Sequence, residues 1–93
     1  MDKEYGIFMW NLQRELDNIN KHGIDFNLAR KVFEDNKRKI FIDSLHSKEE
    51  ERYFCIGKVG MRIITVRFVY REGKIRIFGA GNWRKARKYY EKK

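Results

Sequence analysis

An α+β fold is the class that this sequence predicts, and two changes of periodicity predict it. Apolar residues recur at helical spacing up to about residue 33, at alternate positions from about residue 38 to 80, and at helical spacing again from Asn82. The connections between the alternating segments are short, which favours antiparallel hairpins. We therefore expect two N-terminal helices, an antiparallel four-stranded sheet and one C-terminal helix, in a single domain spanning residues 1–93.

The N-terminal helices are predicted from capping residues. Asn11 can cap a helix over roughly residues 11–22, which ends at Gly23. Asp25 can cap a second helix after a tight corner. The apolar positions expected to face the core are Leu12, Leu16 and Ile19 in the first helix, and Phe26, Ala29, Val32 and Phe33 in the second.

Four alternating runs predict the strands, at residues 38–43, 52–59, 61–70 and 74–80. The polar stretch 43–51 is expected to be a surface loop. From Asn82 the pattern becomes helical again, with Trp83, Ala86, Arg87 and Tyr90 on one side and Arg84, Lys85 and Lys88 on the other.

The net charge of +9 is unevenly distributed along the chain. Residues 1–57 hold ten Lys and Arg against eleven Asp and Glu, whereas residues 58–93 hold twelve against two. Such a basic surface attracts phosphate backbones, and it can also bind an acidic protein or simply keep a small protein soluble. Nucleic acid is the partner that the charge pattern favours.

Several classes of site and location are not expected. Cys55 is the only cysteine and lies in an apolar run, so a buried thiol is expected and a disulfide is excluded. His46 lies in a charged loop, and two distant histidines are too few ligands for a metal. The N-terminus is charged and no apolar run approaches the roughly 20 residues of a membrane span. We expect a cytoplasmic protein with no metal and no cofactor.

The turn Glu72-Gly73 predicts how the last two strands pair. A two-residue hairpin sets Arg71 opposite Lys74 and Val69 opposite Arg76. One face of this hairpin, expected to face the core, is Phe68, Tyr70, Ile75 and Ile77. The other face is Arg67, Val69, Arg71, Lys74, Arg76 and Phe78. Opposed like charges destabilise a sheet by up to about 1 kcal/mol a pair, which favours a bound anion. Alternatively, the arginines stack on aromatic rings or pair with the acids at residues 49–51.

The order and spacing of several motifs resemble the BrnT family across almost the whole chain. The resemblance starts with Phe8, Trp10, Asn11, Arg14 and Asn18, and its most diagnostic run is Lys21-His22-Gly23-Ile24-Asp25-Phe26, followed by Ala29 and Phe33. It continues with Glu51-Arg52-Tyr53, Ile56-Gly57, the basic turn from Arg71, Ile75-Arg76-Ile77-Phe78 and Tyr90-Glu91.

This resemblance implies a RelE-like ribonuclease toxin fold and an RNA-cleaving toxin of a type II toxin–antitoxin system that halts translation. It also implies a BrnA-like antitoxin of the ribbon-helix-helix type, which neutralises the toxin and binds operator DNA on its behalf. The chain departs from the family after the last strand, where Gly79-Ala80-Gly81 replaces the common Ser-Ala-Arg. A decayed toxin homologue is therefore one further reading, and Arg84 is expected to supply the missing cation.

The expected chemistry is metal-independent RNA cleavage. Arginines suit it because their planar donors bridge two phosphate oxygens as negative charge develops. The expected catalytic residues are Arg76, Arg71, Arg84 and, as proton carrier, His22. Arg76 is expected to be the least replaceable, because it lies in the middle of a strand. The expected RNA-binding residues are Arg67, Lys74, Lys21, Trp83 and Lys85.

Two of these residues have structural alternatives. His22 can instead cap the end of the first helix, and Trp83 can be a core residue rather than a base-stacking platform. At the level of the whole protein, the alternative is a non-catalytic basic module that binds nucleic acid or protein on the same scaffold.

Overall fold

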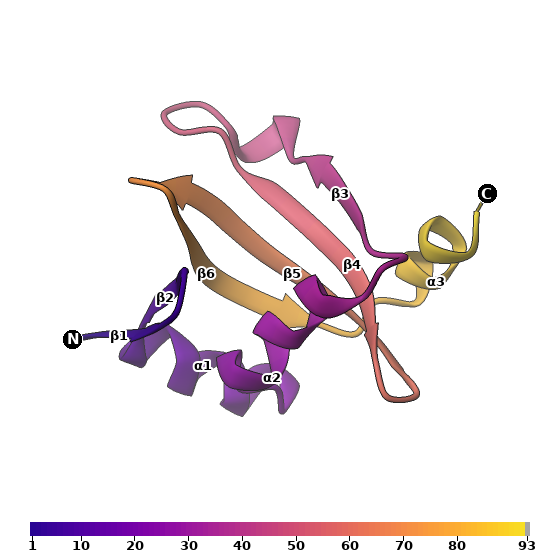
Figure 1. Cartoon of the computed structure of the whole chain (residues 1–93), viewed down its shortest axis with the longest axis horizontal. Helices are drawn as coiled ribbons and strands as arrows, with labels where there is room; N and C mark the ends of the chain where they lie inside the picture. The colour runs from indigo at the N-terminus through magenta and orange to yellow at the C-terminus, as the bar shows by residue number, and fades with distance from the viewer. Residues whose placement is uncertain (93) are drawn as a thin grey trace.

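The computed structural model describes residues 1–92, and over these residues the chain is an α+β protein, as expected (Figure 1). Six strands form one sheet in the order β1-β2-β6-β5-β4-β3. Their bounds are β1 Asp2–Tyr5, β2 Phe8–Asn11, β3 Lys39–Ile42, β4 Tyr53–Val59, β5 Arg62–Arg71 and β6 Lys74–Gly81. The helices are α1 Leu12–His22, α2 Phe26–Arg30 and α3 Arg84–Glu91, with 3₁₀ turns η1 Lys31–Glu34 and η2 Ser44–His46.

The expectation of a four-stranded antiparallel sheet was wrong. The strands β3, β4, β5 and β6 do pair antiparallel in succession, but an N-terminal hairpin adds β1 and β2 to the sheet. The strand β2 pairs with β6 in parallel, with Phe8 beside Ile75 and Trp10 beside Ile77. All four residues of β1 are exposed, so they carry no alternating apolar pattern by which the strand would be predicted.

The helix α1 begins and ends as its capping residues predict, but its buried face was predicted wrongly. The Asn11 side chain accepts a hydrogen bond from the backbone N–H of Arg14, and Gly23 adopts the left-handed φ of 69° that ends the helix. Leu16 and Ile19 are exposed, at 56% and 39% of their surface. The buried residue of α1 is the polar Asn18.

Asn18 holds α1 against the sheet through hydrogen bonds. Its Nδ2 donates to the carbonyl of Ile24 at 2.9 Å, and its Oδ1 accepts from the backbone N–H of Ala80 in β6 at 3.1 Å. A single buried amide therefore satisfies two backbone groups that are far apart in the sequence.

Replacing Asn18 with Ala is expected to lower the free energy of unfolding by about 2–4 kcal/mol, because two buried backbone groups lose their partners. Denaturant unfolding monitored by circular dichroism measures the change. Asn20→Ala is the matched control, since Asn20 is exposed on the same helix. Equal stability of the two variants would contradict this role for Asn18.

The main core lies between the sheet and the segment formed by α2 and η1. Its largest fully buried side chains include Trp10, Phe26 and Phe68. The Glu15 carboxylate joins the layers, because it accepts hydrogen bonds from Trp10 Nε1 at 3.0 Å and from the N–H of Phe26 at 2.8 Å. The second helix is shorter than expected: it is α-helical only to Arg30 and continues as η1.

Two small residues of β4 fit this core. Burial raises the pKa of the Cys55 thiol to about 12, in keeping with the expected buried structural cysteine. Gly57 lies so close to η1 that a Cβ there would be 2.6 Å from Val32 Cγ1 and 2.9 Å from the Val32 carbonyl oxygen. Only a residue without a side chain allows η1 to approach the sheet at this point.

The register of the last hairpin was predicted correctly. Arg71 pairs with Lys74, Val69 with Arg76 and Phe68 with Ile77. A bulge follows, because Arg67 pairs with Gly79 and leaves Phe78 as the extra residue of β6. One residue of the expected core face departs from the prediction: Tyr70 is 51% exposed, with its ring edge-on to Tyr53 and Phe68.

Candidate nucleic-acid interface

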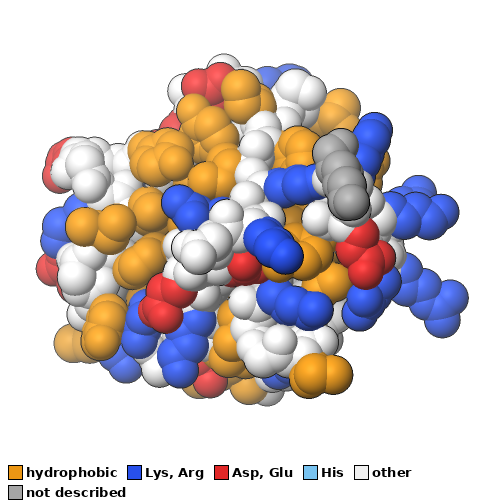
Figure 2. Space-filling model, turned by 45° about the vertical axis from the view of Figure 1, so that its right-hand side comes forward, with side chains coloured by type: hydrophobic (Ala, Val, Ile, Leu, Met, Phe, Trp, Pro, Cys, Tyr) orange, Lys and Arg blue, Asp and Glu red, His pale blue; other side chains and the backbone are white. Residues whose placement is uncertain are grey.

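The face of the sheet opposite the core carries the predicted cations. Arg67, Arg71, Lys74 and Arg76 all project from this face of the β5–β6 hairpin, as the register requires. The helix α3 packs on the same face over β4 and β5, while α1 borders it along β6. Figure 2 shows many Lys and Arg side chains on the side of the molecule where α3 lies, with hydrophobic atoms visible between them.

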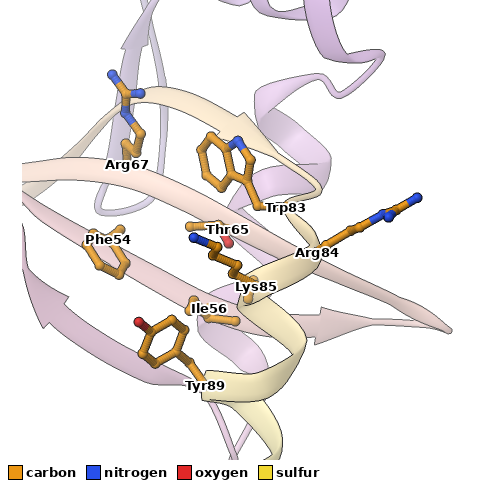
Figure 3. Close-up of a pocket in the computed structure, with 9 residues that line it drawn as sticks. Phe54, Ile56, Thr65, Arg67, Trp83, Arg84, Lys85 and Tyr89 are labelled. Atoms are coloured by element: carbon orange, nitrogen blue, oxygen red, sulfur yellow. The ribbon is translucent and has the colours of Figure 1, made fainter.

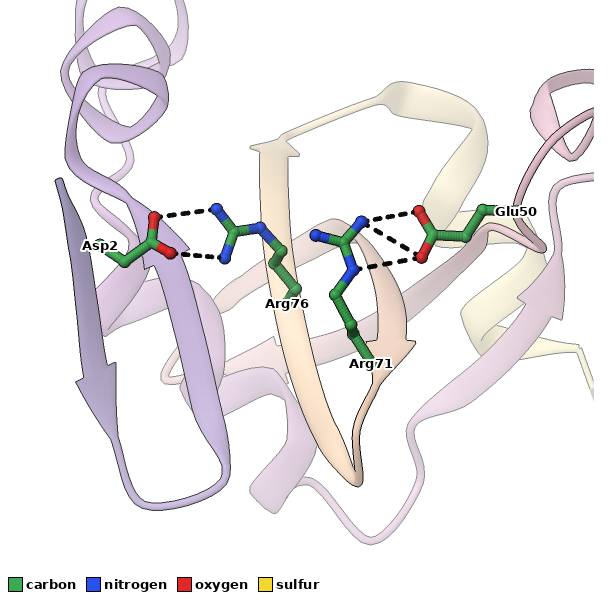
Figure 4. A network of polar contacts seen from close by, with 4 residues as sticks. All are labelled: Asp2, Glu50, Arg71 and Arg76. Atoms are coloured by element: carbon green, nitrogen blue, oxygen red, sulfur yellow. Dashed lines mark hydrogen bonds and ion pairs between the residues drawn. The ribbon is translucent and has the colours of Figure 1, made fainter.

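Three of the four cations are paired with carboxylates. Arg76 donates to both oxygens of Asp2 at 2.9 and 3.0 Å, and Arg71 contacts both oxygens of Glu50, the closer at 2.9 Å (Figure 4). Lys74 forms an ion pair with Glu4. Pairing with the loop acids was one expected alternative, and it is correct for Arg71. The acids of β1 were not foreseen, because that strand itself was missed.

The Asp2–Arg76 pair perturbs both of its members. The hydrogen bond from Arg76 lowers the pKa of Asp2, and the hydrogen bond to Asp2 raises the pKa of Arg76. Arg76 is also the less exposed partner, with 19% of its side chain accessible against 44% for Asp2. Asp2 occupies the Nη1–Nη2 edge of the guanidinium, so an anionic ligand must displace this carboxylate before it can bind that edge of Arg76.

Arg71 and Arg76 line a cavity that we call the arginine pocket. It has a volume of about 240 Å³ and is lined by Arg14, Glu50, Arg52, Val69, Arg71, Arg76 and Phe78. Phe78, the residue of the bulge, lines the pocket with its ring. The guanidinium carbons of Arg52 and Arg67 lie 5.0 and 5.3 Å from the centroid of this ring. Such stacking holds arginines in place without using their hydrogen-bond donors.

A second polar cavity, which we call the α1 site, lies between α1 and the bulge. It also has a volume of about 240 Å³ and is lined by Arg14, Asp17, Asn18, Lys21, His22, Arg67, Phe78, Gly79, Ala80 and Trp83. The structure thus brings four of the predicted residues together: Lys21, His22, Arg67 and Trp83. It does not place Arg71 or Arg76 there, although Arg14 and Phe78 line both cavities.

Sequence reasoning missed Arg14 as a site residue. A signal was present in the sequence. Asn18, Lys21 and His22 follow Arg14 by four, seven and eight residues, so all four lie on one side of a helix. The apolar spacing of Leu12, Leu16 and Ile19 masks this signal, because it predicts a different packed side of α1.

The third cavity, which we call the α3 pocket, is larger and mostly apolar. Its volume is about 500 Å³, and it is lined by Phe54, Ile56, Thr65, Arg67, Trp83, Arg84, Lys85, Ala86 and Tyr89 (Figure 3). The Lys85 amine reaches over the pocket, whereas the Arg84 guanidinium points away from it. Arg84 lines neither the α1 site nor the arginine pocket.

The space beside Gly81 is filled by an aromatic ring rather than by a cation. A Cβ at Gly81 would lie 3.5 Å from the nearest atom of the Trp83 ring, so the indole packs against the strand at this position. Trp83 is nevertheless 44% exposed, so it is not a core residue.

Among residues 1–92, no three His, Cys, Asp or Glu side chains lie together as a potential metal site. No helix in the same range is both long and apolar enough to cross a bilayer. The α1 site and the arginine pocket instead offer arginine, lysine and histidine donors around small polar cavities. This arrangement suits the binding of phosphate groups.

The fold and these cavities define a small basic α+β protein with two polar, cation-lined cavities beside its first helix and its bulged hairpin. A family model described as the ribonuclease toxin, BrnT, of type II toxin–antitoxin systems matches residues 10–88. The chain belongs to this BrnT family of ribonuclease toxins. The match includes every residue of the α1 site, whereas Asp2 and Glu4 lie outside it. No curated protein sequence matches the chain.

Proposed function

We propose that this BrnT-family protein cleaves RNA without a metal ion and so inhibits translation in the cytoplasm. The observation that carries the proposal is the α1 site, where His22 lies with Arg14, Lys21 and Arg67 around one polar cavity. RNA cleavage needs a group that carries a proton, held beside cationic side chains that bind phosphate.

The reaction follows from the chemistry of RNA. The 2′-oxygen attacks the neighbouring phosphorus as its proton leaves, the bond from phosphorus to the 5′-oxygen breaks, and the 5′-oxygen takes up a proton. His22 carries a proton in these steps, because an imidazole can accept and donate near neutral pH. Arg67 stabilises the negative charge that develops on the phosphoryl oxygens, while Arg14 and Lys21 hold the backbone.

The other predicted residues have supporting roles in this proposal. Arg71, Lys74 and Arg76 bind flanking phosphates after exchanging their carboxylate partners for RNA. Lys85 and Trp83 hold the next nucleotide, and Arg84 adds long-range attraction from the start of α3. Arg67 takes the central place that the sequence suggested for Arg76, because the fork of Arg76 is occupied by Asp2.

A BrnA-like antitoxin of the ribbon-helix-helix type is the proposed protein partner. It inhibits by covering the cationic face, and it alone contacts operator DNA. The Lys and Arg side chains of this face support binding of an acidic segment of such a partner.

The experiment is cleavage of a defined RNA by purified protein in excess chelator. We expect cuts that leave a cyclic 2′,3′-phosphate and a 5′-hydroxyl, as attack by the 2′-oxygen requires. Binding of a 2′-O-methyl RNA, which has no free 2′-hydroxyl, is measured over a salt series in parallel. Affinity should fall steeply with salt, because several phosphates lose their counterions on binding. Tight, salt-sensitive binding without any cleavage would instead identify a non-catalytic RNA-binding module.

A further inference from the structure

Two residues that line the α3 pocket have unused hydrogen-bonding capacity. Within residues 1–92, two buried side-chain atoms lack a hydrogen-bond partner: Thr65 Oγ1 and Arg67 Nε. Both residues line this pocket. Thr65 is only 4% exposed, so its unpaired hydroxyl is costly to bury unless a ligand completes it.

The walls of the pocket suit a flat, partly apolar ligand. The aromatic rings of Phe54, Trp83 and Tyr89 surround Thr65, as Figure 3 shows. The volume of about 500 Å³ falls within the range of about 300–1,000 Å³ typical of small-ligand sites. Aromatic side chains of this kind stack on nucleobases, since every base has a π face.

The rim of the pocket is cationic, and no acidic residue lines it. Lys85 places its amine near the aromatic walls, whereas Arg67 lines the edge that the pocket shares with the α1 site and its guanidinium extends away from those walls. The complementary ligand therefore carries negative charge close to a flat ring. An acyl chain would fill the apolar walls but would leave the Thr65 hydroxyl unpaired. A nucleotide can meet all three requirements: its base packs against the aromatic walls and forms a hydrogen bond with the Thr65 hydroxyl, and its phosphate complements the cations.

The pocket also adjoins the proposed cleavage site. Arg67 and Trp83 line both the α3 pocket and the α1 site. A nucleotide with its base in the first cavity therefore has its phosphate beside the second.

We infer that the α3 pocket binds one unpaired nucleobase of the RNA, stacked on Trp83 and hydrogen-bonded to Thr65 Oγ1, next to the phosphate held by Arg67. The inference rests on the proposed function, because it identifies RNA as the ligand. It makes Thr65 the residue that discriminates between base edges, and it makes the pocket the source of any base preference.

The test uses the complete protein and 2′-O-methyl tetranucleotides of each of the four bases, together with one tetranucleotide that carries an abasic position. We expect the abasic position to weaken binding by about 5- to 150-fold, as loss of a stacked base does. Trp83→Ala should cause a similar loss, whereas Trp83→Phe should retain most of the affinity. Lys88→Ala is the control, because Lys88 is an exposed cation of α3 that does not line the pocket.

Thr65→Val tests the role of the hydroxyl. This variant keeps the side-chain shape and removes an unpaired buried group, so its melting temperature should not fall. The ranking of the four tetranucleotides should change. Equal binding of abasic and intact oligonucleotides, or an unchanged ranking in Thr65→Val, would overturn the inference.

Cleavage of unmodified RNA is measured separately, so the two proposals can fail independently. Base-dependent binding without cleavage would refute the ribonuclease activity and leave the base pocket standing. Cleavage without base-dependent binding would refute the base pocket and leave the ribonuclease activity standing. If Trp83→Ala weakened antitoxin binding and left oligonucleotide binding unchanged, the pocket would be a protein-docking site and the inference would be wrong.

Discussion

His22→Gln is expected to lower the rate of RNA cleavage at saturating RNA by about 10²- to 10⁴-fold, the usual contribution of a positioned acid or base. Glutamine keeps a polar side chain of similar reach but cannot exchange a proton near neutral pH. His22 is exposed in the last turn of α1 and lines the α1 site, so its replacement should leave the fold intact. Single-turnover cleavage measures the loss, and circular dichroism checks the fold.

The matched control is His46→Gln. His46 lies in η2 with Nδ1 2.9 Å from Asp43 Oδ2, and it lines neither the α1 site nor the arginine pocket. If His22 only caps the helix, its variant would melt at a lower temperature while each folded molecule cleaved at the normal rate. That result would falsify the assignment of His22 as proton carrier.

Arg67→Lys is expected to lower cleavage by about 10²- to 10³-fold, nearly as much as Arg67→Ala, because one ammonium cannot replace a planar fork at the phosphoryl oxygens. The guanidinium is already oriented, since it stacks on Phe78 and lies beside Gly79, where a Cβ would be 3.7 Å from its Nε. Rates at saturating RNA separate this effect from weaker binding.

Arg62→Lys is the control for Arg67, because Arg62 is exposed on the same strand and outside both polar cavities. Arg76→Ala should cause a smaller loss than Arg67→Ala, because Arg76 is held by Asp2 and lies outside the α1 site. A larger loss at Arg76 would place the reacting phosphate in the arginine pocket instead.

The sequence predicted those parts of the fold that local patterns determine. The caps Asn11 and Gly23, the Glu72-Gly73 turn and the pairing of Arg71 with Lys74 all depend on residues close together in the chain. The parallel pairing of β2 with β6 was not predictable in this way, because it joins residues more than sixty positions apart. The exposed β1 shows no pattern at all.

The candidate site was predicted in its composition more than in its geometry. The register placed Arg67, Lys74 and Arg76 on one face, but the bulge at Phe78 and the acids of β1 determine which of them are free. The closeness of His22 to Arg67 depends on how α1 packs on β6 through Asn18, a contact between distant segments. No local pattern encodes such a contact, so the division into three cavities required the structure.

The hydrogen bond from Ala80 to Asn18 also has a consequence for the timing of protein synthesis. The two halves of the α1 site, His22 on one side and Arg67 and Trp83 on the other, meet only when β6 has been made and has paired with β2. A nascent chain that stops before residue 80 therefore lacks an assembled site, and late pairing of distant strands is intrinsically slow. A ribosome therefore synthesises almost the whole chain before the α1 site can form.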